Sequence, residues 1–120
     1  MIRVVHLFDL KKGVEEREFV EWLDGQLEAS ARRFGCVERK TWALVDGFTG
    51  SYRSPKVVKD RPKYVNEAYW TDMEGPDQFR EWLTSDPDGR ELHERWFGSI
   101  QNHTVLRYVL GWTPMHLGQE

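Results

Sequence analysis

Residues 2–22 read IRVVHLFDLKKGVEEREFVEW, and this stretch decides the fold that the sequence predicts. Residues 2–8 are β-branched or aromatic at most positions, which indicates a β-strand. Both faces of this strand carry apolar side chains, so we expect a central strand that is covered on both sides. The strand also places His6 among apolar neighbours. A turn that ends at Gly13 separates it from a segment with a helical period.

This helical segment runs from residue 14 to residue 34. Acidic residues dominate its first turns, and Arg32 and Arg33 occupy its last turn, an order that complements the helix dipole. Gly35 follows as the expected C-terminal stop. The predicted buried stripe recurs at steps of three or four residues and comprises Phe19, Leu23, Leu27, Ala31 and Phe34, with Trp22 at its edge.

The remainder of the chain supplies three more strands and a second helix. We expect strands at 36–45, 64–71 and 102–112, and a helix that begins near residue 74, is interrupted at 85–89 and continues over 90–97. A basic loop rich in Gly, Ser and Pro spans 46–62 and holds a candidate short strand at 56–58; loops of this length tend to be lids or mobile segments. The resulting order is β-α-β-β-α-β, the ferredoxin-like unit.

This order predicts one α+β domain over residues 1–112, with residues 113–120 as a C-terminal tail. Right-handed crossovers place the first and third strands in the centre of an antiparallel sheet, with both helices on one face. The opposite face carries apolar residues too, and a second copy of the same sheet would cover it. We therefore expect a homodimer joined through its sheet faces, a dimeric α+β barrel.

Composition excludes several classes of protein. A net charge of −3 and a pI near 5.8 give no general attraction to nucleic acid or to an anionic membrane. No apolar run reaches the roughly 18 residues of a membrane span. Cys36 is the single cysteine and the opening residues lack a signal-peptide pattern, so we expect a cytoplasmic protein. The 13% share of aromatic residues predicts that some line a pocket or a subunit interface.

The opening strand, Gly13, the Glu16-x-Glu18-Phe19 run and Trp22 resemble EthD-like members of the dimeric α+β barrel superfamily. The resemblance covers nearly the whole chain as an order of elements. It implies the ferredoxin-like fold and a site between helices and sheet or inside the barrel. The superfamily includes cofactor-free monooxygenases, muconolactone isomerases, polyketide cyclases, haem-degrading enzymes and proteins with no assigned activity, so the fold implies a location for the site rather than a reaction.

The sequence departs from these relatives at their histidines. EthD-like proteins tend to carry a histidine one helical turn after the tryptophan of the first helix, where this chain has Gln26. Polyketide cyclases resemble this chain at a histidine of the first strand, which would be His6. Their second-helix His-Pro-x-His segment corresponds to residues 85–88, which read Ser-Asp-Pro-Asp. Haem-degrading members use an Asn, a Trp and a His; Asn66, Trp70 and His93 are present, but their order and spacing do not match.

Four titratable or charged residues are candidates for catalysis. His6 is either a general base whose pKa is tuned by burial or a half-buried structural histidine at the helix–sheet or dimer interface. Glu67 and Arg107 are charges inside apolar strands. They form a structural ion pair or block edge-to-edge association, or Arg107 binds a carboxylate or enolate while Glu67 takes a proton. His93 is an acid or base over the pocket mouth, or a solvated helix residue.

Aromatic residues supply the candidates for substrate binding. They either form a cavity for a ring-shaped ligand or belong to the core and the dimer interface. No Gly-rich phosphate loop, serine nucleophile elbow or metal-binding spacing is present, so no metal and no cofactor is predicted. The basic side chains of the loop (Arg53, Lys56, Lys59, Arg61) either grip an anion or are solvated. The candidates are Trp22, Trp42, Tyr69, Trp70 and Tyr108.

The first functional hypothesis is a small cytoplasmic dimeric enzyme that acts on an aromatic or polyketide-like molecule by proton transfer, as a cofactor-free isomerase, cyclase or monooxygenase. In it His6 is base or orienter and Arg107 stabilises an anion, with Glu67 and His93 as secondary candidates. The alternative is a non-catalytic small-molecule-binding or stress-associated dimer of the same fold. The third hypothesis is a haem-binding protein.

Overall fold

The computed structural model describes residues 1–110, and its main sheet has the predicted ferredoxin-like topology. The sheet is antiparallel with strand order β2-β5-β1-β6, so the first long strand and the strand predicted at 64–71 lie in the centre, as expected. Residues 111 and 112 of the predicted fourth strand, and the predicted tail 113–120, lie outside the described residues. The strands of this sheet are β1 (Ile2–Leu10), β2 (Cys36–Ala43), β5 (Tyr64–Trp70) and β6 (Ile100–Val109).

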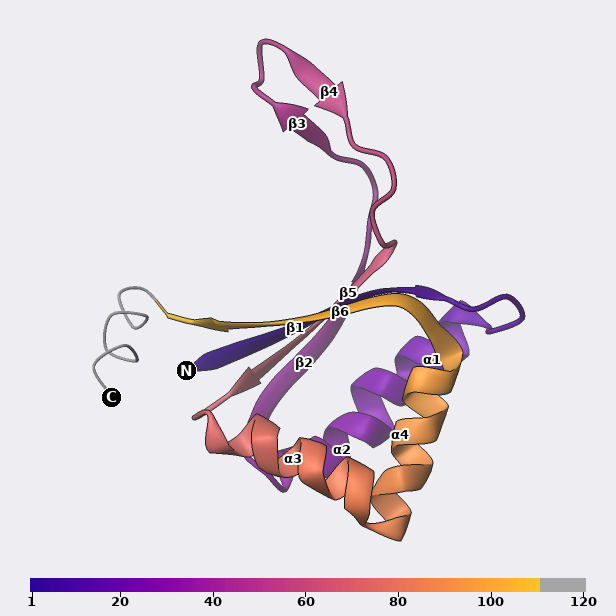
Figure 1. Cartoon of the computed structure of the whole chain (residues 1–120), viewed down its shortest axis with the longest axis vertical. Helices are drawn as coiled ribbons and strands as arrows, with labels where there is room; N and C mark the ends of the chain where they lie inside the picture. Colours follow the sequence, from indigo (N-terminus) through magenta and orange to yellow (C-terminus); the bar gives the residue numbers. More distant parts are fainter. Residues whose placement is uncertain (111–120) are drawn as a thin grey trace.

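All the helical segments lie on one side of the sheet, as Figure 1 shows. Between β1 and β2 the chain forms α1 (Glu16–Trp22), the π-helical turn η1 (Leu23–Leu27) and α2 (Glu28–Arg32). Between β5 and β6 it forms α3 (Glu74–Ser85) and α4 (Pro87–Ser99). No helix among residues 1–110 combines the length and apolarity that crossing a membrane requires.

The first predicted helix is interrupted by the π-turn, which the sequence analysis did not foresee. The predicted stripe is nevertheless buried from Phe19 to Ala31, with Leu23 and Leu27 fully enclosed, and Phe34 at its end is partly buried. A π-turn inserts an extra residue into the helical repeat, and such turns occur mostly inside α-helices near functional sites. Here the wider turn contains Asp24, and Glu28 follows it directly; both carboxylates bond to side chains of the sheet. The polar residues of the helix are therefore placed against the sheet beside its apolar stripe.

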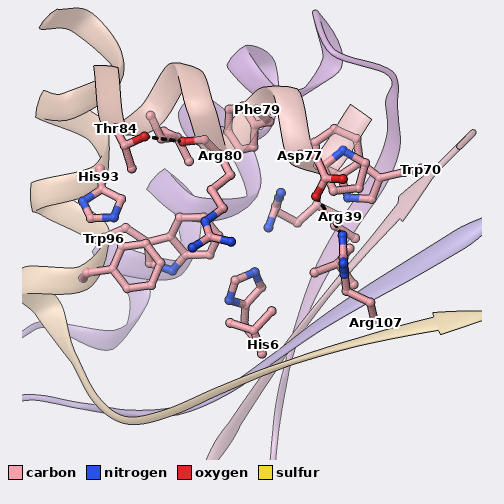
Figure 2. A pocket seen from close by; sticks show the side chains of 16 residues that line it. His6, Arg39, Trp70, Asp77, Phe79, Arg80, Thr84, His93, Trp96 and Arg107 are labelled. Atoms are coloured by element: carbon pink, nitrogen blue, oxygen red, sulfur yellow. Dashed lines mark hydrogen bonds and ion pairs between the residues drawn. The ribbon is translucent and has the colours of Figure 1, made fainter. Parts of the chain in front are cut away.

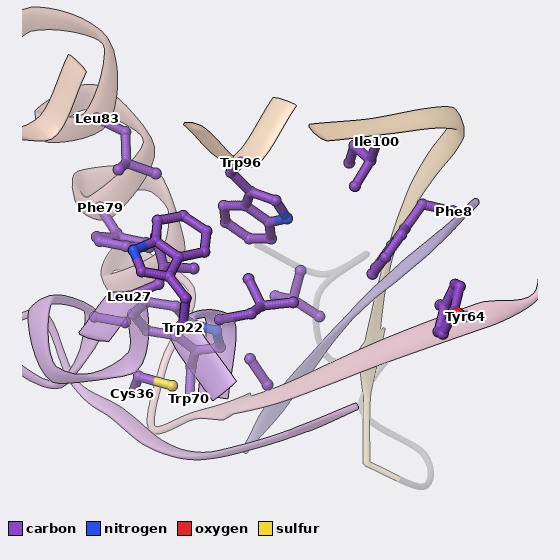
Figure 3. Close-up of a cluster of buried hydrophobic side chains, with 14 of the residues drawn as sticks. Phe8, Trp22, Leu27, Cys36, Tyr64, Trp70, Phe79, Leu83, Trp96 and Ile100 are labelled. Atoms are coloured by element: carbon purple, nitrogen blue, oxygen red, sulfur yellow. The ribbon is translucent and has the colours of Figure 1, made fainter. Parts of the chain in front are cut away.

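The core fills the space between the helices and the sheet. Its aromatic part includes Phe8, Trp22, Trp70, Phe79 and Trp96, all of which are buried (Figure 3). Rings from β1, α1, β5, α3 and α4 thus meet in a single cluster. Burial of this apolar surface stabilises the fold, because the hydrophobic effect is the dominant favourable term in folding.

The predicted loop 46–62 contains a small hairpin. Its strands are β3 (Phe48–Gly50) and β4 (Pro55–Val57), so the candidate strand at 56–58 is present one residue earlier, and β3 was not predicted. Gly50 has a φ of +92° at the start of the tight turn, a conformation that favours glycine. In Figure 1 the hairpin extends away from the main sheet. Strands this short leave no periodicity in the sequence.

The predicted interruption of the second helix is confirmed but is shorter than expected. α3 ends at Ser85 and α4 begins at Pro87. Asp86 is the N-cap of α4, and its carboxylate accepts a hydrogen bond from the backbone N–H of Asp88 at 2.9 Å. Pro87 at the first helical position needs no hydrogen-bond partner for its nitrogen, so the segment 87–89 joins the helix instead of forming a loop.

Candidate functional site

A cavity of about 590 Å³ lies between the sheet and the helices α3 and α4 (Figure 2). Its floor comes from the helix-facing side of the four strands β1, β2, β5 and β6, and its other walls come from α3 and α4. The walls are mainly apolar and aromatic, with titratable side chains among them, which is the usual composition of a small-molecule site. The lining residues are Val4, His6, Arg39, Ala68, Trp70, Pro76, Asp77, Phe79, Arg80, Leu83, Thr84, His93, Trp96, Phe97, Val105 and Arg107.

A histidine on the floor of the cavity, His6, is bonded to a second histidine, His103, beside the cavity. The Nδ1 atom of His6 and the Nε2 atom of His103 are 2.8 Å apart. Their ring planes lie within 5° of parallel with centroids 5.1 Å apart, as expected for rings joined edge to edge by this hydrogen bond. One ring donates and the other accepts, so the pair shares one N–H at this contact. When His6 donates, its Nε2 atom keeps a lone pair that can accept a proton.

The surroundings of His6 keep its imidazole neutral. His6 is 9% exposed, and the ring of Trp96 lies 4.6 Å from its own. Burial, then the positive charge of Arg39 and the neighbouring His103, hold the pKa of His6 well below its ordinary value of 6.5. Burial also lowers the pKa of His103. Both histidines are therefore neutral at pH 7, the state in which an imidazole can act as a base.

A buried polar network lies next to the histidines. Arg39 of β2 donates through Nε to Glu28 Oε1 at 3.0 Å and through Nη1 to Asn66 Oδ1 at 2.6 Å. Asn66 Nδ2 donates to Thr41 Oγ1 at 2.8 Å, and Thr41 Oγ1 donates to Asp24 Oδ1 at 2.8 Å. The side chains of Arg39 and Glu28 are 1% and 5% exposed. This network ties the π-turn region to two strands and fixes Arg39 in the cavity wall.

Cys36 contributes to the same buried region as a structural group. Its Sγ atom donates to Glu28 Oε1 at 3.1 Å. Burial, with the nearby Glu28 carboxylate, raises the pKa of Cys36 to about 12. A thiol with such a pKa stays protonated at neutral pH, which excludes it as a nucleophile.

The remaining charges of the cavity lie near its mouth. Arg107 Nη1 donates to Asp77 Oδ1 at 2.8 Å, so β6 and α3 are joined by an ion pair there. Figure 2 shows the guanidinium group of Arg80 reaching from α3 into the space above His6. His93 of α4 lies on the same wall, half-buried, with its ring 4.5 Å from that of Phe97.

The structure brings together only part of the site proposed from the sequence. His6, Arg107, His93 and Trp70 all line the cavity. Trp22 packs in the core beside Phe19 instead. Gln26, at the position where EthD-like proteins tend to carry a histidine, is exposed.

The other candidates lie on the opposite face of the sheet, which we call the outer face. Val4 pairs with Arg107 of β6 and with Ala68 of β5, so Glu67 points away from the cavity. Glu67 forms an ion pair with Arg3 and accepts a hydrogen bond from Trp42 Nε1 at 3.1 Å. The expectation that Glu67 and Arg107 share a pocket is not met. Tyr69 and Tyr108 lie beside Arg3 on this outer face.

Four residues that matter for the cavity were missed by the sequence analysis: His103, Arg39, Arg80 and Trp96. The register of β1 and β6 is irregular between Leu7 and Asp9, and Asn102 has a φ of +53° there. Bulges of this kind re-aim side chains, and this one lies next to His103. A charge within an alternating strand was the one available signal for Arg39. Nothing in the sequence marks Arg80 among the exposed residues of its helix.

Among residues 1–110, no group of three or more His, Cys, Asp or Glu side chains is placed to hold a metal ion. No family model and no curated protein matches the sequence.

Solved structures do match. The Arabidopsis thaliana protein At3g17210 aligns with a TM-score of 0.66 at 13% identity, over 92% of this chain and 96% of that one. A hydroxynitrile lyase from Passiflora edulis aligns with a TM-score of 0.60 at 17% identity, over 93% and 94%. An EthD family protein from Bacillus halodurans aligns with a TM-score of 0.52 at 16% identity, over 92% and 99%. At such identities the likeness concerns the fold, and this chain has the fold of the EthD-like α+β proteins that its opening strand and helix resemble.

Proposed function

We propose that this protein is an enzyme that moves a proton on a small organic molecule bound in the cavity, with His6 as the general base. The observation that carries the proposal is the neutral, buried His6 on the floor of a largely apolar cavity, with its Nδ1 atom bonded to the half-buried His103. A general base must be unprotonated at its working pH and within reach of the substrate proton. His6 is unprotonated at neutral pH, and its place in the cavity wall supports contact with the substrate proton.

The proposed chemistry follows from the two histidines. The Nε2 atom of His6 takes a proton from a C–H or O–H bond of the substrate, and the bonding electrons stay on the substrate as an enolate or alkoxide. His103 receives the Nδ1 proton of His6 through the 2.8 Å contact, so positive charge moves toward the less buried ring. Arg107 faces the same space and stabilises the negative charge that develops. His93 remains a secondary acid or base on the wall formed by α4.

Isomerisation, cyclisation, cofactor-free oxygenation and hydroxynitrile cleavage can all begin with this proton removal. The aromatic side chains of Trp70, Trp96 and Phe97 in the walls favour a substrate with an aromatic or polyketide-like body. Glu67 is left out of the proposed mechanism because it lies on the outer face of the sheet.

We also propose that the protein is a homodimer joined through the outer face. Trp42, Leu106 and Tyr108 are 55%, 39% and 48% exposed on this face in one protomer. Exposed aromatic residues grouped on an uncovered sheet are typical of subunit interfaces. Trp42, Tyr69 and Tyr108 then serve association rather than substrate binding.

The non-catalytic alternative uses the same cavity without chemistry. A filled and dry space at His6 would have favoured it, whereas the space is open and polar groups converge on it. Haem binding has less support, because the side chain of Asn66, one of its candidate residues, is fully buried and engaged by Arg39 and Thr41.

The test is proton exchange into D₂O, followed by NMR, with a panel of small carbon acids such as benzoylacetone and phenylacetone, and with mandelonitrile cleavage as a further reaction. The protein should accelerate at least one of these. His6→Asn keeps a hydrogen-bonding group near the Nδ1 position but removes the base, and it should lower the rate by about 10²- to 10⁴-fold. A panel without any acceleration, or a His6→Asn variant as fast as the parent, contradicts the proposal.

A further inference from the structure

The cavity carries an excess of positive charge. Three arginines line it, Arg39, Arg80 and Arg107, against a single carboxylate, that of Asp77. The two histidines that line the cavity, His6 and His93, add no negative charge. A negative group of a substrate would therefore enter a space whose lining side chains are mainly cationic.

The three arginines differ in whether their guanidinium group is already paired with a carboxylate. Arg39 is bound to the buried Glu28 carboxylate and to Asn66. Arg107 is bound to Asp77 at 2.8 Å. Arg80 forms no ion pair and no side-chain hydrogen bond within residues 1–110. Within the described residues, its guanidinium group is thus the only one of the three whose charge is not already paired with a carboxylate.

The position of Arg80 suits a ligand with two parts. The guanidinium group of Arg80 extends from α3 above His6, and Trp96 lies in the adjacent wall (Figure 2). The ring of Phe97, which also lines the cavity, lies 5.1 Å from that of Trp96. A planar guanidinium binds a carboxylate through two parallel hydrogen bonds, and the neighbouring rings can pack against an apolar body. A carboxylate held by Arg80 would leave the body of the molecule next to the His6 ring.

From this arrangement we propose that the cavity binds an aromatic carboxylate and that Arg80 holds its carboxylate group. The inference rests on the proposed function in naming the substrate class of the same site. It assigns separate tasks to two arginines: Arg80 binds the carboxylate that the substrate already has, and Arg107 faces charge that develops during the reaction.

The test is equilibrium binding by isothermal titration calorimetry with 1-naphthoate and with the neutral, equally shaped 1-naphthamide. The parent should bind the naphthoate on the order of 10- to 100-fold more tightly than the amide, the usual contribution of a charge-assisted pair. Arg80→Gln should remove that preference, and Arg80→Lys should retain part of it. Arg90→Gln, an exposed arginine of α4 outside the cavity, makes the same change in net charge and should bind like the parent.

Three results would overturn the assignment. In the first, the parent binds both probes equally or binds neither. In the second, Arg80→Gln binds naphthoate as the parent does. In the third, Arg107→Gln loses binding while Arg80→Gln keeps it. The assay needs no turnover, so it is independent of the proposed chemistry. His6→Asn should still bind naphthoate within about threefold of the parent while it loses proton exchange; intact exchange in that variant contradicts the proposed function and leaves the binding result standing.

Discussion

The two faces of the sheet use polar residues in opposite ways. On the helix side, Arg39, Glu28 and Asn66 are sealed from water and bonded to one another. On the outer face, Arg3 and Glu67 form an ion pair whose arginine side chain is 44% exposed. Both pairs join an arginine to a glutamate, and yet their energetic roles differ, because burial decides what happens when one partner is removed.

On the helix side the polar groups are fixed and hold the cavity in shape. A buried ion cannot lose its partner and turn to water, so the network has one arrangement. On the outer face the side chains can be rehydrated in a single protomer. The helix side is therefore suited to positioned chemistry, and the outer face to association with another surface.

The largest effect should come from breaking the buried pair. Arg39→Ala leaves the Glu28 carboxylate buried without its main partner and should lower the free energy of unfolding by about 3–5 kcal/mol, measured by urea denaturation. Arg3→Ala, the matched change on the outer face, should cost less than about 1 kcal/mol. The double variant Arg39→Met with Glu28→Leu should recover most of the loss, because no unpaired charge remains. Equal losses for Arg39→Ala and Arg3→Ala would remove the distinction between the two faces.

The second effect concerns association. Trp42→Arg places a charge on the proposed interface and should weaken the dimer by at least about 2 kcal/mol, seen as a shift to monomer in size-exclusion chromatography with light scattering. Tyr52→Arg, on the hairpin and 92% exposed, is the control and should leave the mass unchanged. A parent protein that is monomeric at every concentration, or a Trp42→Arg variant that stays dimeric, argues against the outer face as the interface.

The same contrast explains what the sequence could predict. The β-α-β-β-α-β order, the central strands and the buried stripe follow from hydrophobic periods, and all are confirmed. The cavity residues depend on register, because a shift of one residue moves a side chain to the other face. Glu67 and Arg107 looked like partners because both are charges inside apolar strands. The register of β1 with its two neighbours places them on opposite faces.

Two other features lie beyond periodicity altogether. His103 contacts His6 and follows Asn102, whose φ is positive and which lies where the register of β1 and β6 shifts. The π-turn at residues 23–27 places carboxylates against the sheet, and an ordinary helical repeat does not anticipate it. Both are local departures from regular geometry, and both lie at the candidate site, where such departures are common.

A third effect is the pH dependence of stability on the helix side. The pKa of His6 and that of His103 are lowered in the folded protein, so the unfolded chain binds more protons when the pH falls below about 6.5. The contribution of the two histidines to the free energy of unfolding should therefore be constant above that pH. It should decrease as the pH falls below it, by at most about 1.4 kcal/mol per pH unit for each proton.

Urea denaturation at several pH values between 7.5 and 5 measures this dependence. The variant with both His6→Asn and His103→Gln should show a flatter profile than the parent, since the other titratable groups are common to both. Parallel profiles would mean that neither histidine is held neutral by folding.

The smallest effect should come from the outer carboxylate. Glu67→Gln removes one partner of a partly exposed pair and should change the free energy of unfolding by less than about 1 kcal/mol. It should also leave naphthoate affinity and proton exchange within about twofold of the parent, because its side chain lies across the sheet from the cavity.

Asp77→Asn is the matched change on the cavity side. It removes the carboxylate that lines the cavity and should tighten naphthoate binding severalfold, because a negative charge that repels the bound anion is gone. Weaker binding or slower exchange in Glu67→Gln, with no change in Asp77→Asn, would reverse the assignment of the two faces.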